Sequence, residues 1–168
     1  MYDKKIDFYF NSDVEEIEDE LFSLLKETFI HLIRNSVAHG IETVKERVKK
    51  NKSEGGLISI EILKKDRDFV VYYSDDGIGL NYGKILNKAI QFGLIKNEEA
   101  EKLSKSEITK LIFKDEFSTS DEGNMIAGTG VGMSVIKENI LEKLNGKIKI
   151  VNNAQKGLRF EIIIPDVE

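Results

Sequence analysis

The feature that most constrains the fold is a long amphipathic stretch in the first quarter of the chain. The residues of its apolar face, with one threonine among them, recur at helical spacing: Val14, Ile17, Leu21, Leu24, Leu25, Thr28, Leu32 and Ile33. We therefore expect one long helix that runs to about His39, with Gly40 as its C-terminal cap. Ser12 and Glu15 have the spacing of a capping box, so the helix should begin directly after a strand over residues 4–10.

The rest of the chain interleaves strands and helices without a strict strand–helix–strand rhythm. The strand-like runs form two expected hairpins: 57–64 with 68–74, and 147–151 with 158–164. The expected helices are 42–50, 81–92, 97–103, 106–113 and 131–144. Residues 114–127 show no periodicity and suit a loop. This mixture predicts an α+β fold, a two-layer sandwich whose mixed, mostly antiparallel sheet carries the long helices on one face.

Composition excludes several classes of function. At 168 residues the chain is expected to form a single domain, 1–168. It has no cysteine, which excludes disulfides, thiolate catalysis and Cys-ligated metals. The net charge is only −5, so nothing indicates nucleic acid as a partner. No apolar run approaches the roughly 20 residues of a membrane span, and no signal peptide opens the chain, so we expect a cytoplasmic protein.

Both histidines lie in the run HLIRNSVAHG, at the end of the expected long helix. His31 and Asn35 would stand one turn apart on the same face, with His39 slightly round from them. An imidazole and a carboxamide placed in this way can hold a hydrated Mg²⁺ and the phosphates it carries. Arg34 and His39 border this polar stripe and could counter phosphate charge. The alternative is a helix with one satisfied buried histidine, a surface amide and a solvent-facing arginine.

A glycine-containing turn, DDGIG, follows the strand 68–74. A carboxylate at a strand end, here Asp75, can accept a hydrogen bond from an exocyclic amine such as adenine N6. Gly77 and Gly79 would let the backbone turn sharply and approach a flat base. An ordinary strand-to-helix turn would explain the same residues.

A second glycine motif, GTGVGM, opens the expected helix 131–144. Successive amides that lead into a helix N-terminus favour phosphate, and the motif supplies five candidate contacts: Gly128, Gly130, Val131, Gly132 and Met133. It lacks the ending of a Walker A loop and the preceding strand of a dinucleotide-binding fold. A flexible hinge before a helix is the alternative.

Three further candidates, Phe117, Ser118 and Thr119, lie shortly before this motif. The hydroxyls could reach a terminal phosphate while Phe117 anchors the loop, although a solvated loop with one anchoring aromatic is equally consistent. The basic run 45–52 is interpreted as a solvated helix face.

In order, these motifs resemble the N, G1, F and G2 boxes of the GHKL ATPase/kinase superfamily, which includes gyrase, Hsp90, MutL and histidine kinases. The resemblance is closest to the catalytic ATP-binding domain of the CheA chemotaxis histidine kinases and covers about residues 5–165. It rests on these segments: HLIRNSVAHGIE, DDGIGL, KAIQFGLI, LIFKDEFSTS and GTGVGMSVIKENI.

The resemblance implies an ATP site that is closed by a lid over about residues 117–128. It implies that Asn35 ligates Mg²⁺, with His31 beside it as a further ligand or phosphate contact, and that His39 lies near the phosphates. Asp75 would hold adenine N6. The glycines would have two roles: Gly77 and Gly79 at the base, and Gly128, Gly130 and Gly132 at the phosphates.

The chain departs from the family pattern at several positions. Ala38 and Ser134 stand where acidic residues are usual, Glu27-Thr28 replaces Asp-Pro, and Asp115-Glu116 replaces Pro-Gly. ATP-hydrolysing relatives typically place a glutamate four residues before the metal-binding asparagine, where it acts as general base. His31 occupies that position here. Phosphoryl transfer to a histidine needs no such base, so the exchange favours a kinase over an ATPase.

Both histidines belong to the expected site, so the phosphoacceptor histidine must lie on another domain or chain. We expect an excised catalytic domain, monomeric alone, of a protein with dimerisation and regulatory domains that works with a coupling protein and a response regulator. Two other functions stay open: a non-catalytic nucleotide-sensing module, and a slow ATPase of the gyrase or Hsp90 kind.

Overall fold

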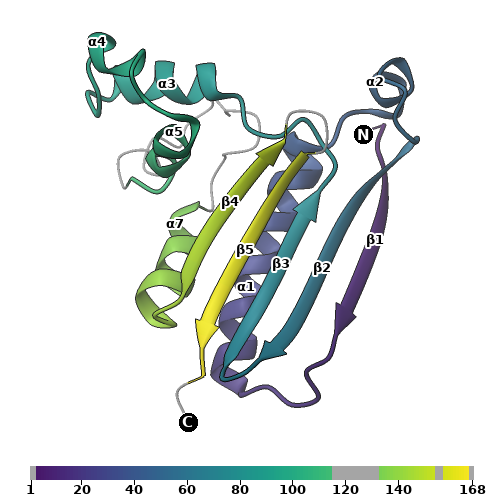
Figure 1. Ribbon diagram of the computed structural model, residues 1–168. Helices are drawn as coiled ribbons and strands as arrows, with labels where there is room; N and C mark the ends of the chain where they lie inside the picture. Colours follow the sequence, from purple (N-terminus) through teal and green to yellow (C-terminus); the bar gives the residue numbers. More distant parts are fainter. Residues whose placement is uncertain (1–2, 115–132, 154–156, 167–168) are drawn as a thin grey trace.

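A five-stranded mixed sheet organises the computed structural model, which describes residues 3–114, 133–153 and 157–166 (Figure 1). Its spatial order is β1-β2-β3-β5-β4. The strands are β1 (Lys5–Ser12), β2 (Gly55–Lys65), β3 (Asp68–Asp75), β4 (Lys147–Asn153) and β5 (Gly157–Pro165). β1 pairs with β2 in parallel, and every other pair is antiparallel. The predicted α+β class and both predicted hairpins are confirmed.

The helices lie on one face of the sheet and at one of its ends (Figure 1). The long helix α1 crosses behind the sheet, and α7 with its continuation η2 lies beside it. Short helices gather at the end of the sheet where β3 finishes. The bounds are α1 (Asp19–Asn35), η1 (Ser36–Gly40), α2 (Val44–Lys49), α3 (Tyr82–Gln91), α4 (Asn97–Ala100), α5 (Lys105–Leu111), α7 (Met133–Ile136) and η2 (Lys137–Lys143).

The core lies between α1, α7–η2 and the helix-facing side of the sheet. Leu21, Leu25 and Leu32 of α1 are buried at spacings that place them on one helix face. Alternate residues of the central strands are buried against that face, because successive side chains of a strand point to opposite sides. The other sheet face is more polar: the Ser59 and Ser74 hydroxyls bond across β2 and β3 at 2.7 Å.

The predicted start of the long helix is wrong. α1 begins at Asp19, and the Ser12 hydroxyl instead accepts a hydrogen bond from the amide of Val14 at 3.1 Å. The reason is that sheet pairing continues past Ser12. The amide of Asp13 donates to the carbonyl of Ile62 at 3.2 Å, and the Asp13 carboxylate accepts from the amide of Lys64 at 2.8 Å. A helix cannot begin while these groups still bind β2.

The predicted end of the helix is confirmed in position but not in geometry. After Asn35 the chain widens into the π-helical turn η1, closed by the amide of Ile41 donating to the carbonyl of Ser36 at 2.7 Å. Gly40 is therefore the last residue of this turn, followed by Ile41 as the cap, and it is not among the glycines with positive φ that would make a left-handed cap. The expected loop 114–127 lies, beyond residue 114, outside the described residues.

Candidate functional site

One cavity opens where the π-helical turn η1 meets the ends of β3 and β5. Its walls combine apolar side chains with a few polar ones, the composition common to ligand pockets. The lining residues are Leu32, Asn35, Ser36, Gly40, Asp75, Gly79, Met133, Leu158 and Phe160. π-helical turns occur often at functional sites, and this one begins directly after Asn35 and contributes both Ser36 and Gly40.

Asp75 is the buried carboxylate of this cavity, with 5% of the residue exposed. Its Oδ2 accepts a hydrogen bond from the Ser36 hydroxyl at 2.6 Å, and its Oδ1 accepts one from the amide of Gly77 at 3.0 Å. Both donors are neutral. Burial raises the pKa of the Asp75 carboxyl, and the adjacent Asp76 charge raises it further. The hydrogen bonds from Ser36 and from the backbone amides of Gly77 and Leu158 only partly oppose that rise.

Tyr73 stands behind Ser36, away from solvent. Its hydroxyl donates to the Ser36 Oγ at 2.7 Å, and its ring packs edge-to-face on Phe160 with centroids 6.1 Å apart. Burial raises the pKa of the Tyr73 phenol, so the hydroxyl keeps its proton. Three side chains thus form a continuous hydrogen-bonded series, from Tyr73 through Ser36 to Asp75.

Two glycines allow the DDGIG turn to approach its neighbours closely. A Cβ at Gly77 would lie 2.1 Å from the carbonyl oxygen of Gly40. Gly79 has φ +70°, and a Cβ there would lie 2.3 Å from the Oδ1 of Asn152. The turn is also pinned to η1, because the amide of Ile78 donates to the Gly40 carbonyl at 2.8 Å. Both glycines are required by the backbone itself; their contact with a base stays a prediction.

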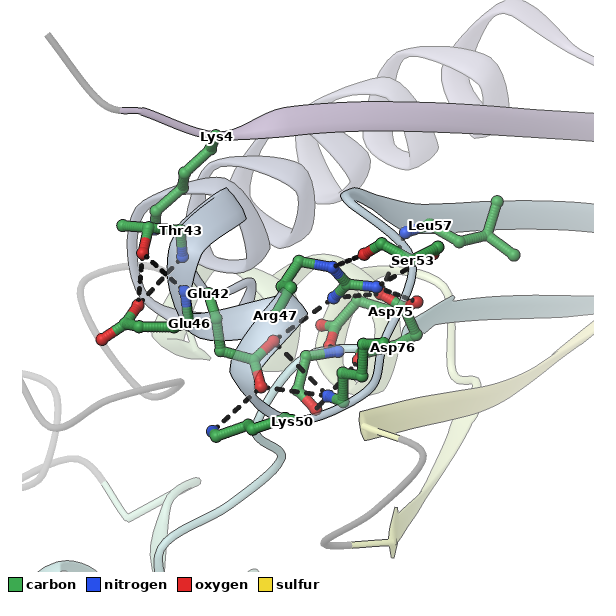
Figure 2. Close-up of polar contacts among 12 residues, drawn as sticks. Lys4, Glu42, Thr43, Glu46, Arg47, Lys50, Ser53, Leu57, Asp75 and Asp76 are labelled. Carbon is green, nitrogen blue, oxygen red and sulfur yellow. Dashed lines mark hydrogen bonds and ion pairs between the residues drawn. The ribbon is translucent and has the colours of Figure 1, made fainter.

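A buried ion-pair network connects the DDGIG turn to α2 and the residues that flank this helix (Figure 2). Arg47 of α2 is fully buried and donates to both oxygens of Asp76, at 3.1 and 2.7 Å, and to Glu42 at 3.3 Å. The Lys52 ammonium donates to the carbonyls of Asp76 and Gly77 at 2.7 and 3.0 Å. The interpretation of the run 45–52 as a solvated face is therefore wrong for Arg47, whose partner Asp76 lies 29 residues further along the chain.

The predicted phosphate-side residues are only partly brought to the cavity. Asn35 lines it and is 7% exposed, whereas Arg34 is exposed and His31 and His39 are half-buried. Within the described parts of the chain, the Nδ2 of Asn35 and the Nδ1 of His31 are buried without a hydrogen-bond partner. Burial lowers the pKa of His39, and nearby Lys4 lowers it further.

Met133, the last residue of the second glycine motif, is buried and lines the cavity. The other predicted contacts of that motif and of the loop before it lie outside the described residues: Phe117, Ser118, Thr119, Gly128, Gly130, Val131 and Gly132. Sequence reasoning missed Ser36, Tyr73 and Phe160 as parts of the cavity region. Ser36 lies within the HLIRNSVAHG run, so its neighbourhood was signalled even though its role was not.

Comparison with known proteins places the chain in a family. The family model described as histidine kinase-, DNA gyrase B-, and HSP90-like ATPase matches residues 23–168. The chain is 36% identical over 162 residues to the chemotaxis protein CheA of Listeria monocytogenes and 37% identical over 162 residues to CheA of Bacillus subtilis. Each alignment covers 96% of this chain but only 26% and 24% of those proteins, so the chain spans about a quarter of their length.

Solved structures agree on the fold. The catalytic domain of the histidine kinase ThkA superposes with a TM-score of 0.56 at 22% identity, over 96% of this chain and 80% of that one. The histidine kinase domain of the blue-light activated kinase of Erythrobacter litoralis superposes with a TM-score of 0.55 at 13% identity, over 96% of this chain and 55% of that one.

Among the described residues, no helix has the length and apolar character needed to cross a membrane. The chain belongs to the histidine kinase-, DNA gyrase B- and HSP90-like ATPase family, and its sequence is similar to a segment of the CheA proteins.

Proposed function

We propose that this chain, as a single domain, is the ATP-binding catalytic domain of a CheA-like histidine kinase. In this proposal it binds Mg·ATP in the cavity beside η1 and passes the γ-phosphate to a histidine on another domain or chain. The observation that carries the proposal is Asp75, a buried carboxylate in the cavity wall. Its hydrogen-bond donors are the Ser36 hydroxyl and the backbone amides of Gly77 and Leu158, and all of them are neutral.

The base would bind at the Asp75 end of the cavity. An ionised carboxylate only accepts hydrogen bonds, so Asp75 suits the 6-amino group of adenine and opposes the 6-carbonyl of guanine. Leu32, Leu158 and Phe160 offer apolar surface for a flat ring. Gly77 and Gly79 would let the backbone lie close to that ring.

The phosphates would bind at the Asn35 end. The described residues contain no group of three or more histidine and acidic side chains that could hold a metal by itself. Asn35 would instead ligate, through its amide oxygen, a Mg²⁺ that arrives with the nucleotide and keeps several waters, with the unpartnered Nδ1 of His31 as a further contact. The unpartnered Nδ2 of Asn35 is a hydrogen-bond donor and would bind a phosphate oxygen. Bound there, Mg²⁺ would neutralise phosphate charge during transfer. Arg34 and His39 would add positive charge or hydrogen bonds at the edge of this region.

The remaining contacts are proposed from the glycine motif and the loop before it. Gly128, Gly130, Val131 and Gly132 would bind phosphate through their amides, next to the buried Met133. The segment that contains Phe117, Ser118 and Thr119 would act as the lid.

In the transfer step, a neutral imidazole of the acceptor attacks the γ-phosphorus with its lone pair. The bond between the γ-phosphorus and the β,γ-bridging oxygen breaks, and ADP leaves. No general base is required, which agrees with a histidine at position 31. The acceptor, the dimerisation and regulatory domains, the coupling protein and the response regulator would be supplied by the longer protein and its cytoplasmic partners.

Calorimetry of ADP and ATP, with and without Mg²⁺, tests the binding half of the proposal. Micromolar-to-millimolar binding that responds to Mg²⁺ supports it, and absence of binding overturns it. Transfer of label from [γ-³²P]ATP to a supplied phosphoacceptor domain tests the kinase half. Binding without transfer would identify a nucleotide-sensing module. Phosphate release without any acceptor, lost in Asn35→Ala, would identify a slow ATPase.

A further inference from the structure

We propose that Tyr73 is a positioning residue for base recognition: acting through Ser36, it holds the Asp75 carboxylate as an acceptor for a 6-amino group and so strengthens the preference for adenine over 6-oxo purines. This inference rests on the proposed ATP-binding function, because it concerns the same cavity.

The series of side chains is short and buried. Tyr73 and Asp75 are two residues apart on β3, so they project from the same face of the strand. Ser36, the first residue of η1, lies between them in the hydrogen-bonded series, with bonds of 2.7 Å from Tyr73 and 2.6 Å to Asp75. All three residues are buried, and two of them, Ser36 and Asp75, line the cavity while Tyr73 stands behind.

The direction of both hydrogen bonds follows from counting hydrogens. An ionised Asp75 can only accept, so the single hydrogen of the Ser36 hydroxyl must be donated to it. The Ser36 oxygen is then an acceptor toward Tyr73, and the phenol, which keeps its proton, supplies the hydrogen. Hydrogen bonds arranged head to tail polarise one another, so donation by Tyr73 strengthens the bond from Ser36 to Asp75.

Ser36 has an alternative partner that Tyr73 disfavours. A helical serine commonly donates to the carbonyl four residues earlier, which for Ser36 is that of Leu32. In the structure the Ser36 hydroxyl donates to Asp75 instead. The phenol of Tyr73 favours this rotamer because it places a donor where the serine oxygen must accept. Without it, Ser36 can rotate away and leave the Oδ2 of Asp75 without its donor.

A purely structural explanation is that a buried tyrosine simply needs a partner for its hydroxyl. That explanation and the positioning role differ in one measurable respect. A structural defect would weaken binding of every nucleotide alike. A positioning defect would weaken only those nucleotides whose base donates a hydrogen bond to Asp75.

The test is calorimetric binding of ADP, GDP and purine riboside diphosphate, which has no 6-substituent, to Tyr73→Phe. We expect ADP affinity to fall about three- to tenfold, purine riboside diphosphate affinity to stay within about twofold, and the ADP-over-GDP preference to narrow. Thermal unfolding checks that the variant is folded. Tyr72→Phe is the matched control, since it makes the same chemical change on the opposite face of β3, and it should leave all three affinities unchanged.

A double-variant cycle tests whether Tyr73 acts through Ser36. Ser36→Ala should reproduce the loss of ADP affinity, and adding Tyr73→Phe to it should cause no further loss. Equal weakening of ADP and purine riboside diphosphate, or unchanged ADP affinity in Tyr73→Phe, overturns the inference while leaving the proposed function in place. If the unmodified protein binds none of these nucleotides, the proposed function fails and the inference fails with it.

Discussion

Asp75 and Asp76 are adjacent at the end of β3, yet their surroundings are opposite. Asp75 is buried in the cavity wall and is held by a hydroxyl and a backbone amide. The side chain of Asp76 is 34% exposed and is bound by two nitrogens of Arg47 and by the amide of Leu57, the latter at 2.9 Å (Figure 2). One carboxylate thus has neutral donors, and its neighbour has a bidentate cationic partner.

This difference indicates that the two adjacent residues have different roles: Asp75 is available to bind a ligand, and Asp76 stabilises the fold. A carboxylate that is bound by a buried arginine has its charge neutralised and its oxygen acceptor sites already used. A carboxylate that is buried beside neutral donors keeps unsatisfied capacity to accept, which a ligand can use. Burial accordingly raises the pKa of Asp75, whereas an adjacent cation would have lowered it.

The largest effect on the free energy of unfolding is expected when Arg47, the cationic partner of Asp76, is replaced. Arg47→Met leaves Glu42 and Asp76 without their shared partner, and breaking a buried pair on one side typically costs about 3–5 kcal/mol. Urea unfolding followed by circular dichroism would measure the free energy of unfolding. Arg47→Lys is the matched control: it keeps the charge but loses the planar fork, and it should cost less. A loss below 1 kcal/mol in Arg47→Met would show that the network contributes little.

The second prediction exchanges one aspartate at a time. Asp75→Asn should weaken ADP binding by about 1–3 kcal/mol, because an amide nitrogen would face the donors that the carboxylate now accepts from. Asp76→Asn should instead lower the free energy of unfolding, with a smaller change in ADP affinity. Calorimetry and urea unfolding of both variants give the four numbers required. Equal losses of ADP affinity in the two variants would remove the distinction between the two carboxylates.

The elements of the fold were predictable because they depend on local periodicity. Polar–apolar alternation predicted β2 and β3, and the spacing of four and then seven residues between Leu21, Leu25 and Leu32 predicted α1. The start of α1 was mispredicted because Asp13 continues the sheet through bonds to residues about 50 positions away. The π-helical turn η1 is also invisible to a search for a 3.6-residue period, since it spans only five residues.

The candidate site was predictable only where a motif is contiguous. Asp75, Gly77 and Gly79 stand out as a glycine turn after a strand, and Asn35 stands out in a polar run on an apolar helix. In the sequence Tyr73 looks like any other strand residue, because Ser36, the partner of its hydroxyl, is 37 residues away. Arg47 likewise looks like one more member of a basic run, because its partner Asp76 is 29 residues away. Long-range polar partners leave no pattern in a single sequence.

The third prediction concerns pH and carries a definite sign. Because the folded pKa of Asp75 is raised, the folded state takes up a proton before the unfolded state does. On this account the free energy of unfolding rises as pH falls from the raised pKa toward the ordinary carboxyl value, by less than about 1.4 kcal/mol per pH unit. ADP affinity should fall over the same interval, since a protonated carboxyl has lost an acceptor site.

Comparison with Asp75→Asn isolates this contribution from those of other carboxyls. The difference in free energy of unfolding between the two proteins, measured by urea unfolding across this interval, should increase in favour of the unmodified protein as pH falls. A difference that stays constant with pH would mean that the folded environment does not raise the pKa of Asp75. The contrast between Asp75 and Asp76 would then lie in the geometry of their hydrogen bonds alone.

The smallest effect is expected at Lys50, which shares Glu42 with Arg47. Its ammonium lies 3.1 Å from the Oε1 of Glu42, but its side chain is 54% exposed, and Glu42 also receives the ammonium of Lys52 at 3.0 Å. Exposed ion pairs contribute about 0–1 kcal/mol, so Lys50→Met should cost less than 1 kcal/mol, and that loss should vanish in 1 M salt. Urea unfolding at low and high salt measures both quantities. A loss as large as that of Arg47→Met would mean that the number of cations around Glu42, and not the burial of one of them, secures the turn that carries Asp75 and Asp76.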